Sequence, residues 1–319
     1  GAFNQASING AAGSTITHAY GGYNRVITGT ADEVAHNSLT GCYAEIETDP
    51  SGTGRTTTTG YLFRGVYDDD SSAEHKFTKE TYAIKQNITS QNLLLHECKV
   101  MQFLQTHKNI PKLKWYGAIN KHPSLIIEFM YLSLNELERD TRIRCENVET
   151  YFNQMISVVE YIHSKGIIHR DIKPDNFMIR NNRKEICLID FGLSRTYKNN
   201  DGVRHKCETN VGLIGSKNYC SINMHNGVRP SRRDDIESLL YVFIYYLEGQ
   251  LPWALINIIN ETDMKLLLKL NLREIDFQGP TTLNYINAIK TCHNNNRFIK
   301  YHDKPDYDNL HSIYKFSTK

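Results

Sequence analysis

The stretch HRDIKPDNF at residues 169–177 constrains the fold of this chain more than any other part of its sequence. It gathers a histidine, an arginine, two aspartates, a lysine and an asparagine around a proline that the interior of an ordinary helix does not accept. Directly before it, residues 149–166 carry apolar side chains at helical spacing and end in Gly166, a typical helix C-cap. The sequence therefore predicts a polar loop at the end of an amphipathic helix.

A further acidic group follows this loop closely. The apolar run EICLI at residues 185–189 predicts a buried strand that ends in Asp190. Asp171, Lys173, Asn176 and Asp190 are thereby expected in one neighbourhood. Carboxylate and amide oxygens suit Mg²⁺ together with phosphate oxygens, and a lysine suits a phosphate in transfer. These residue types predict phosphoryl-transfer chemistry.

The two halves of the chain differ in their periodicity. The second half is helical, and residues 232–249 are apolar on most faces, which predicts a helix buried within its domain. In the first half we expect a helix over residues 92–107 and a polar connection over residues 68–79. Four segments are expected to form strands: 41–48, 60–68, 80–86 and 124–132. Strands first and helices afterwards indicate an α+β body with two lobes.

Composition narrows the choice of partners and compartment. A formal net charge of +2 disfavours a nucleic-acid binder, and no apolar run is long enough to span a bilayer. The seven cysteines are scattered without a CxxC pair, which excludes a zinc site of that kind and favours a reduced intracellular compartment, cytoplasmic or nuclear. We expect a soluble monomer. Residues 1–40 carry no secretory signal and are either a disordered leader or an additional packing element.

HRDIKPDN followed by DFG at residues 190–192 resembles the catalytic loop and metal-binding motif of protein kinases. The resemblance implies that Asp171 orients the substrate hydroxyl and that Lys173 neutralises the γ-phosphate of ATP. It also implies that Asn176 and Asp190 bind Mg²⁺, for which Mn²⁺ is a possible substitute. A lysine two residues after the catalytic aspartate resembles serine/threonine kinases.

Upstream, YAIK at residues 82–85 resembles the lysine motif of the third kinase strand. The resemblance implies that Lys85 contacts the α- and β-phosphates and that Glu97 is its helix partner. It further implies that the adenine lies against residues 128–130 and that Ile127 controls the pocket behind it. The expected nucleotide-binding residues are Lys85, Glu97, Gly60, Ile127, Glu128, Phe129 and Met130.

Residues 215–253 resemble the casein kinase 1 family more narrowly. The activation segment ends in SIN, where most kinases have APE, and SRRDDIESL and LPW follow. Residues 301–314 resemble the last helices of the family, and vaccinia-related kinases are the nearest relatives. The resemblance implies that His169 and Phe191 are structural and pack between the lobes. It also implies that Asp235 accepts backbone hydrogen bonds from the catalytic loop.

The family resemblance implies a bilobal protein-kinase fold with ATP in its cleft. Residues 1–40 would be a leader or extension of unknown role, and residues 41–129 a small lobe of antiparallel sheet with one main helix. Residues 130–319 would be a larger helical lobe.

The glycine loop departs from the kinase pattern GxGxxGxV. If Gly60 is its third glycine, Arg55 and Thr57 occupy the first two glycine positions. An alternative register uses Gly52 and Gly54 with an enlarged loop.

A second departure lies at Asn218, where the family commonly has an arginine that binds phosphorylated substrates. Lys217 with Arg232 or Arg233 would then form the substrate anion site. Alternatively, the stretch SRR at residues 231–233 only leads into a helix.

The function expected from these motifs is transfer of the γ-phosphate of ATP to serine or threonine hydroxyls of protein substrates, as in casein kinase 1. The alternative is a catalytically weak pseudokinase that acts as a binding scaffold or allosteric partner, which the missing glycines motivate. A small-molecule phosphotransferase is disfavoured, because the long activation segment and the SIN region resemble a platform for docking peptides.

Overall fold

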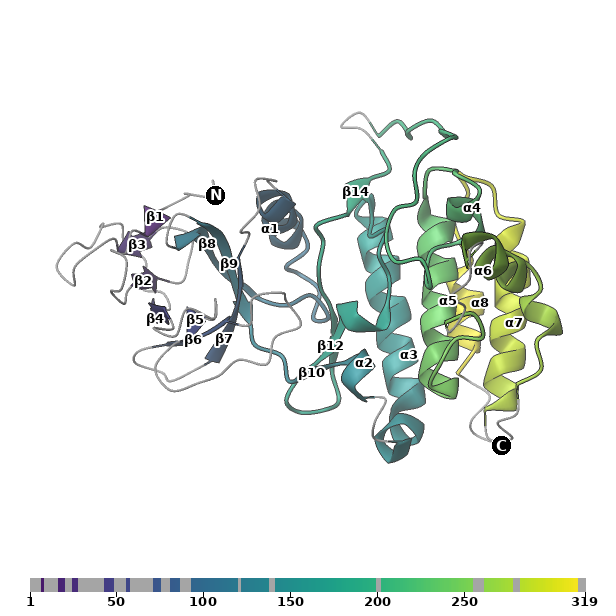
Figure 1. Cartoon of the computed structure of the whole chain (residues 1–319), viewed down its shortest axis with the longest axis horizontal. Helices are drawn as coiled ribbons and strands as arrows, with labels where there is room; N and C mark the ends of the chain where they lie inside the picture. Colours follow the sequence, from purple (N-terminus) through teal and green to yellow (C-terminus); the bar gives the residue numbers. More distant parts are fainter. Residues whose placement is uncertain are drawn as a thin grey trace. The chain divides into compact units, whose positions relative to one another are not determined.

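The chain divides into two compact units, Gly1–Tyr131 and Leu132–Lys319 (Figure 1). The structure is a computed structural model. It describes the following residues: 7–8, 17–20, 25–27, 43–48, 56–57, 71–75, 81–86, 93–119, 122–137, 141–198, 202–254, 261–277 and 282–314.

The first unit is built on one large sheet. Among its described residues, nine strands pair in the order β1-β8-β9-β7-β6-β4-β2-β3, with β5 added beside β4. The pairs are antiparallel except for β1 with β8. The strands are β1 (Ser7–Ile8), β2 (Thr17–Tyr20), β3 (Arg25–Ile27), β4 (Tyr43–Thr48), β5 (Thr56–Thr57), β6 (Ser71–His75), β7 (Thr81–Gln86), β8 (Leu113–Ile119) and β9 (His122–Glu128).

Helix α1 (Leu93–Phe103) packs against β8 and β9 of this sheet. Its buried residues follow helical spacing at i, i+3, i+4 and i+7, so that one stripe faces the strands. These residues are Leu94, Glu97, Cys98 and Met101. The predicted helix is confirmed, although it is shorter than the predicted range 92–107.

Three of the four predicted strands, in 41–48, 80–86 and 124–132, are confirmed as β4, β7 and β9. The polar connection predicted over 68–79 contains a further strand, because β6 pairs with β7 within it. Polar residues form this strand because backbone pairing with a neighbour, rather than an alternating pattern, determines it. The predicted strand at 60–68 lies outside the described residues. Strands β1 to β3 come from the segment 1–40.

The second unit is mainly helical. Its described helices are α2 (Leu134–Leu137), α3 (Thr141–Ser164), α4 (Ile222–His225), α5 (Arg232–Glu248), α6 (Glu261–Leu270), α7 (Leu283–Arg297) and α8 (Tyr307–Ser312), with short 3₁₀ turns at Pro174–Asn176 and Leu272–Glu274. Two small sheets accompany them: β10 (Leu132–Ser133) with β12 (Phe177–Ile179) and β13 (Ile186–Leu188), and β11 (Ile167–Ile168) with β14 (Arg195–Thr196).

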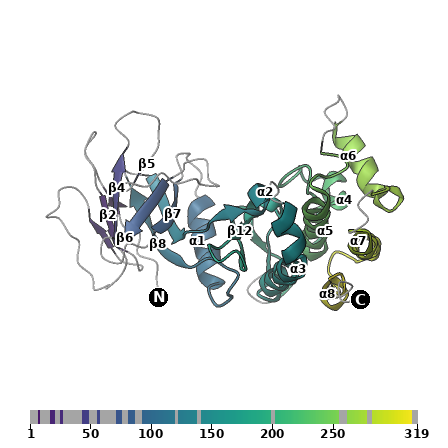
Figure 2. The ribbon, with the colours of Figure 1, turned by 90° about the horizontal axis from the view of Figure 1, so that it is seen from below.

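Helix α5 is the centre of the second unit, as its apolar sequence predicts. Figures 1 and 2 show it with α3 on one side and α7 on the other. The rings of Phe152 and Phe243 stack between α3 and α5 with centroids 3.9 Å apart. Asp234 caps the helix start by accepting the Ser231 N–H at 2.7 Å. Gly249 ends the helix in the left-handed region, at φ 80°.

Among the described residues, every helix is too short or too polar to cross a membrane.

Candidate active site

Two predicted site residues form an ion pair in the first unit. The Nζ atom of Lys85, on β7, lies 2.9 Å from Oε2 of Glu97, on α1. Sheet pairing sets Lys85 opposite Leu125 of β9, and the buried stripe of α1 turns Glu97 inward. Because the Glu97 side chain is only 3% exposed, water screens the pair little. The structure therefore brings these two residues together as a fixed ammonium–carboxylate unit.

The residues expected to contact adenine lie at the end of β9 and just beyond it. Ile127 and Met130 are buried. Glu128 is held by the residue that precedes β8, since its carboxylate accepts the Lys112 N–H at 3.1 Å. The adenine contact itself stays a prediction, and Gly60 lies outside the described residues.

The predicted catalytic loop is compact. The Nζ atom of Lys173 lies 2.9 Å from Oδ2 of Asp171. Asn176 follows in a 3₁₀ turn, and its Nδ2 donates to the Asp171 carbonyl oxygen at 2.8 Å and to Oδ2 at 3.3 Å. The proline at the start of this turn fixes its backbone. The structure thus places a lysine ammonium and an amide on one aspartate whose side chain is held in a single orientation.

Asp235, on the first turn of α5, fixes the backbone of the same loop. Its Oδ2 accepts the His169 N–H at 2.7 Å, and its Oδ1 accepts the Arg170 N–H at 2.8 Å. Burial alone would raise the pKa of Asp235, but the hydrogen bonds from the His163 side chain and the His169 amide hold that pKa below its usual value. The prediction that Asp235 accepts backbone hydrogen bonds from this loop is confirmed.

Ser216 was not predicted as a site residue, yet it contacts the predicted catalytic aspartate directly. Its backbone N–H and its hydroxyl both donate to Oδ1 of Asp171, each at 2.9 Å. Gly215 precedes it at φ 80°, and a Cβ there would lie 2.5 Å from the carbonyl oxygen of Arg170. The Gly-Ser pair at residues 215–216 was the available signal, because glycine is needed where two backbones approach this closely.

Asp190 follows β13 in the left-handed region, at φ 62°. Its Oδ1 accepts the Gly192 N–H at 3.3 Å, and this hydrogen bond orients the carboxylate. His169 and Phe191 pack as an edge-to-face pair with centroids 5.1 Å apart, and both are fully buried. His169 also bonds the Ile189 carbonyl through Nε2 at 3.0 Å. The interpretation of His169 and Phe191 as packing residues agrees with these contacts.

The structure does not gather the residues expected to form a substrate anion site. Arg232 is buried, donates to the carbonyl oxygens of His302 and Asp303 at 2.8 and 2.9 Å, and lies over a tyrosine ring. Arg233 donates to the Ile299 carbonyl at 2.6 Å. Lys217 is exposed on its loop. The two arginines bind carbonyl oxygens near the C-terminus and so have a structural role. Among the described contacts, none joins them to Lys217.

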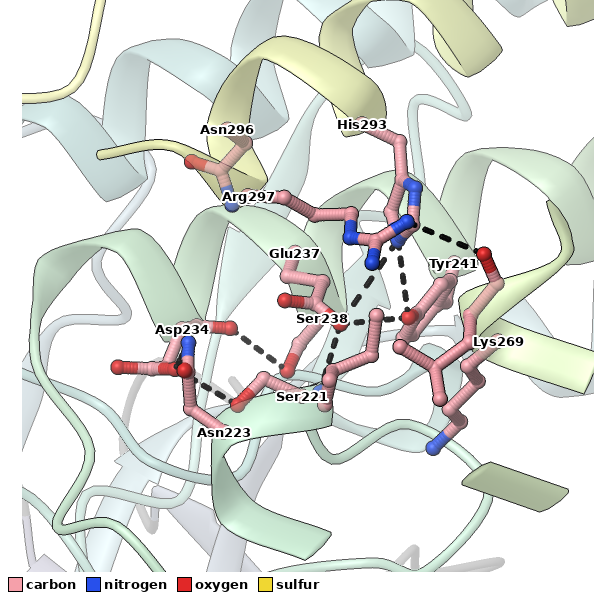
Figure 3. A network of polar contacts seen from close by, with 12 residues as sticks. Ser221, Asn223, Asp234, Glu237, Ser238, Tyr241, Lys269, His293, Asn296 and Arg297 are labelled. Atoms are coloured by element: carbon pink, nitrogen blue, oxygen red, sulfur yellow. Dashed lines mark hydrogen bonds and ion pairs between the residues drawn. The ribbon is translucent and has the colours of Figure 1, made fainter. Parts of the chain in front are cut away.

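A second buried polar network holds the segment that follows Ser216. Figure 3 shows Asp234 directed at Ser221 and Asn223, which donate to its Oδ1 at 2.7 and 3.0 Å. Glu237 accepts the Ile222 N–H at 2.7 Å and the Tyr241 hydroxyl at 2.6 Å. Burial alone would raise the pKa of Glu237, but His293 and these donors hold it below its usual value. Acidic residues of α5 therefore fix this segment.

The donor set fits a magnesium ion that keeps most of its water. Asn176 uses its amide nitrogen towards Asp171, which leaves its amide oxygen as a possible ligand. The described residues contain no cluster of three or more His, Cys, Asp or Glu side chains that would hold a metal alone. Mg²⁺ commonly binds one or two carboxylates together with waters and phosphate oxygens, so one aspartate and one amide suffice.

The chain was compared with models of known protein families. Residues 61–303 match the model described as protein kinase domain. The matched range includes the Lys85–Glu97 pair, the loop around Asp171, the Asp190 turn and Asp235. It ends before α8.

Proposed function

Because the chain belongs to the protein kinase family, we propose that it is an ATP-dependent serine/threonine kinase of the casein kinase 1 type. Its fold is the α+β fold of protein kinases, and family membership supports a phosphotransferase that acts on protein substrates. Two features support the finer assignment: Lys173 resembles the lysine of serine/threonine kinases, and the SIN region resembles casein kinase 1. We also propose the lobe division at residues 129–130 that the sequence predicts.

The observation that carries the proposal is the arrangement around Asp171. Its carboxylate receives the Lys173 ammonium at 2.9 Å and two donors from Ser216, each at 2.9 Å. Such an aspartate would orient a serine or threonine hydroxyl and accept its proton during transfer. Lys173 would neutralise charge on the transferring phosphoryl group, and Lys85, aligned by Glu97, would do so for the other phosphates. Positioning and charge stabilisation are what this reaction needs from a protein.

Asn176 and Asp190 are the proposed ligands of Mg²⁺. When bound, the ion would neutralise phosphate charge. Asp171 precedes Lys173 and Asn176 in the loop, and its Oδ2 contacts both residues, which holds the carboxylate in one orientation. A rigid carboxylate of this kind favours reaction, because little reorganisation is left for the transfer step.

We propose an intracellular monomer, cytoplasmic or nuclear, without a nucleic-acid partner. The composition supports this proposal, and five cysteines among the described residues are free thiols, as a reduced compartment would leave them.

The test is transfer of labelled γ-phosphate from ATP to casein with Mg²⁺. Asp190→Ala should lower transfer by about a hundredfold or more, because a charge-stabilising ligand is lost. Asp175→Ala is the matched control: this aspartate lies in the same loop, but its Oδ1 accepts only the exposed Asn135 amide, at 3.0 Å. It should keep nearly full activity.

The outcomes separate the kinase from the pseudokinase. Transfer that falls in Asp190→Ala and persists in Asp175→Ala supports the kinase. A folded wild-type chain whose melting temperature rises with Mg²⁺ and ATP, but which transfers no phosphate, would indicate a binding scaffold. Transfer to small alcohols but not to casein would contradict a protein substrate.

A further inference from the structure

A chain of buried hydrogen bonds runs from the C-terminal helix α8 to the catalytic loop. The Tyr307 hydroxyl, on α8, lies 2.7 Å from Nδ1 of His163, at the end of α3. Nε2 of the same imidazole lies 2.9 Å from Oδ2 of Asp235. Tyr307, His163 and Asp235 are each at most 4% exposed. Three elements distant in sequence therefore meet through one imidazole ring.

Chemistry sets the direction of these bonds. A carboxylate only accepts hydrogen bonds, so the Nε2 of His163 carries a proton and donates to Asp235. When the imidazole is neutral, its Nδ1 accepts the hydrogen bond from the Tyr307 hydroxyl. Burial raises the pKa of Tyr307, so this hydroxyl keeps its proton. Tyr307 thus holds the His163 ring in the orientation in which its Nε2 reaches Asp235.

Asp235 in turn holds the backbone of the catalytic loop. Its two oxygens accept the N–H groups of His169 and Arg170, the two residues before Asp171. Arg170 has a φ of 70°, a conformation that non-glycine residues seldom adopt without support. The carboxylate of Asp235 supplies that support, so a rotation of Asp235 would change the backbone that carries Asp171.

Tyr307 is itself firmly placed. Residues 299–314, the C-terminal strap, run across the helices of the second unit. Arg232 and Arg204 both donate to the His302 carbonyl, and Arg233 holds Ile299. Asp306 caps the start of helix α8, and its carboxylate accepts the Asn309 N–H at 3.0 Å. The strap therefore presents the Tyr307 hydroxyl at a fixed point.

We propose that Tyr307 is a positioning residue that orders the catalytic loop through His163 and Asp235. The inference deepens the proposed kinase function and rests on it for its effect on rate. Tyr307 contacts no residue expected to bind ATP or metal among those described. Its effect should therefore appear in turnover rather than in nucleotide affinity.

The chain offers a matched control in Tyr314. Its hydroxyl also joins the strap to α3, by donating to Oδ1 of Asn153 at 3.0 Å, and it bonds His311 at 2.8 Å. Tyr314 is 9% exposed against 4% for Tyr307. None of its hydrogen-bond partners named here contacts Asp235, so loss of its hydroxyl tests the structural contribution alone.

The experiment compares Tyr307→Phe with Tyr314→Phe. Tyr307→Phe should lower kcat about five- to tenfold, the effect of losing about one hydrogen bond, with KM for ATP unchanged. Tyr314→Phe should lower the melting temperature about as much as Tyr307→Phe does. It should leave kcat unchanged. In parallel, hydrogen exchange of the His169 and Arg170 amides should become faster in Tyr307→Phe only.

Each outcome decides the inference. Faster exchange and lower kcat in Tyr307→Phe alone would support it. Equal exchange of these amides in both variants, or a kcat loss shared by both, would overturn it. If the wild-type chain transfers no phosphate, the proposed function fails, and the exchange rates still decide whether Tyr307 orders the loop.

Discussion

Replacing Gly215 by alanine tests how closely the loop around Ser216 approaches the catalytic loop. At φ 80° an alanine is strained by about 1–2 kcal/mol. Its Cβ would lie 2.5 Å from the Arg170 carbonyl oxygen and 3.1 Å from Oδ1 of Asp171. Neither neighbour is the flexible end of a long side chain, so the backbone itself must shift, at a cost of about 1–3 kcal/mol. We expect a loss of about 3 kcal/mol in the free energy of unfolding.

The same shift should reduce catalysis. The displaced groups are the carbonyl before Asp171 and the carboxylate of Asp171 itself, and small misplacements of reacting groups cost about tenfold to a hundredfold in rate. We expect Gly215→Ala to lower kcat within that range. Urea denaturation gives the stability, and initial rates of phosphate transfer to casein give kcat.

Two other glycines separate the contributions. Gly166 has a φ of 82° but nothing within 4 Å of its Cβ position, so Gly166→Ala measures backbone strain without a clash. Gly212 has open space and no positive φ, so Gly212→Ala should be nearly neutral. If Gly215→Ala were no less stable than Gly166→Ala and retained full kcat, the close approach described above would be refuted.

Two further predictions concern neighbouring residues. Ser216→Ala removes one of the two Ser216 donors to Asp171, so kcat should fall about fivefold and stability by about 1 kcal/mol; unchanged kcat in initial-rate assays would contradict this. Burial lowers the pKa of Lys269 from 10.5 to about 8. The unfolded chain then binds the proton more strongly between those pH values, so stability should rise across that window by up to about 3 kcal/mol. Lys269→Met should abolish the rise in urea midpoints measured against pH, whereas a rise of equal size in both proteins would refute the assignment.

Sequence reasoning succeeded where the chemistry is local. Asp171, Lys173 and Asn176 lie within one short loop, so a proline and a turn suffice to bring them together. The buried helix α5 was likewise predicted, because residues apolar on most faces leave few other arrangements. Asp235 was assigned through family resemblance, since a contact across 66 positions leaves no trace in local spacing.

The missed features depend on tertiary pairing. The bond between His163 and Tyr307 joins residues 144 positions apart, and neither residue has a distinctive neighbourhood in sequence. Strand β6 was missed because Ser71–His75 is polar and owes its form to the strands beside it. For Arg232 the sequence left open an anion site or a helix approach, and the structure shows its guanidinium donating to carbonyl oxygens that the sequence could not place there.

The start of α5 holds two different loops in place, which protein engineering would need to change separately. Asp234 and Glu237 hold residues 221–223 of the segment after Ser216, whereas Asp235 between them holds the loop that carries Asp171. Because these acids lie on the first two turns of one helix, a substitution that tilts this end of α5 disturbs both loops at once. Engineering of peptide preference in this chain should therefore begin at exposed positions such as Lys217 and leave this end of α5 intact.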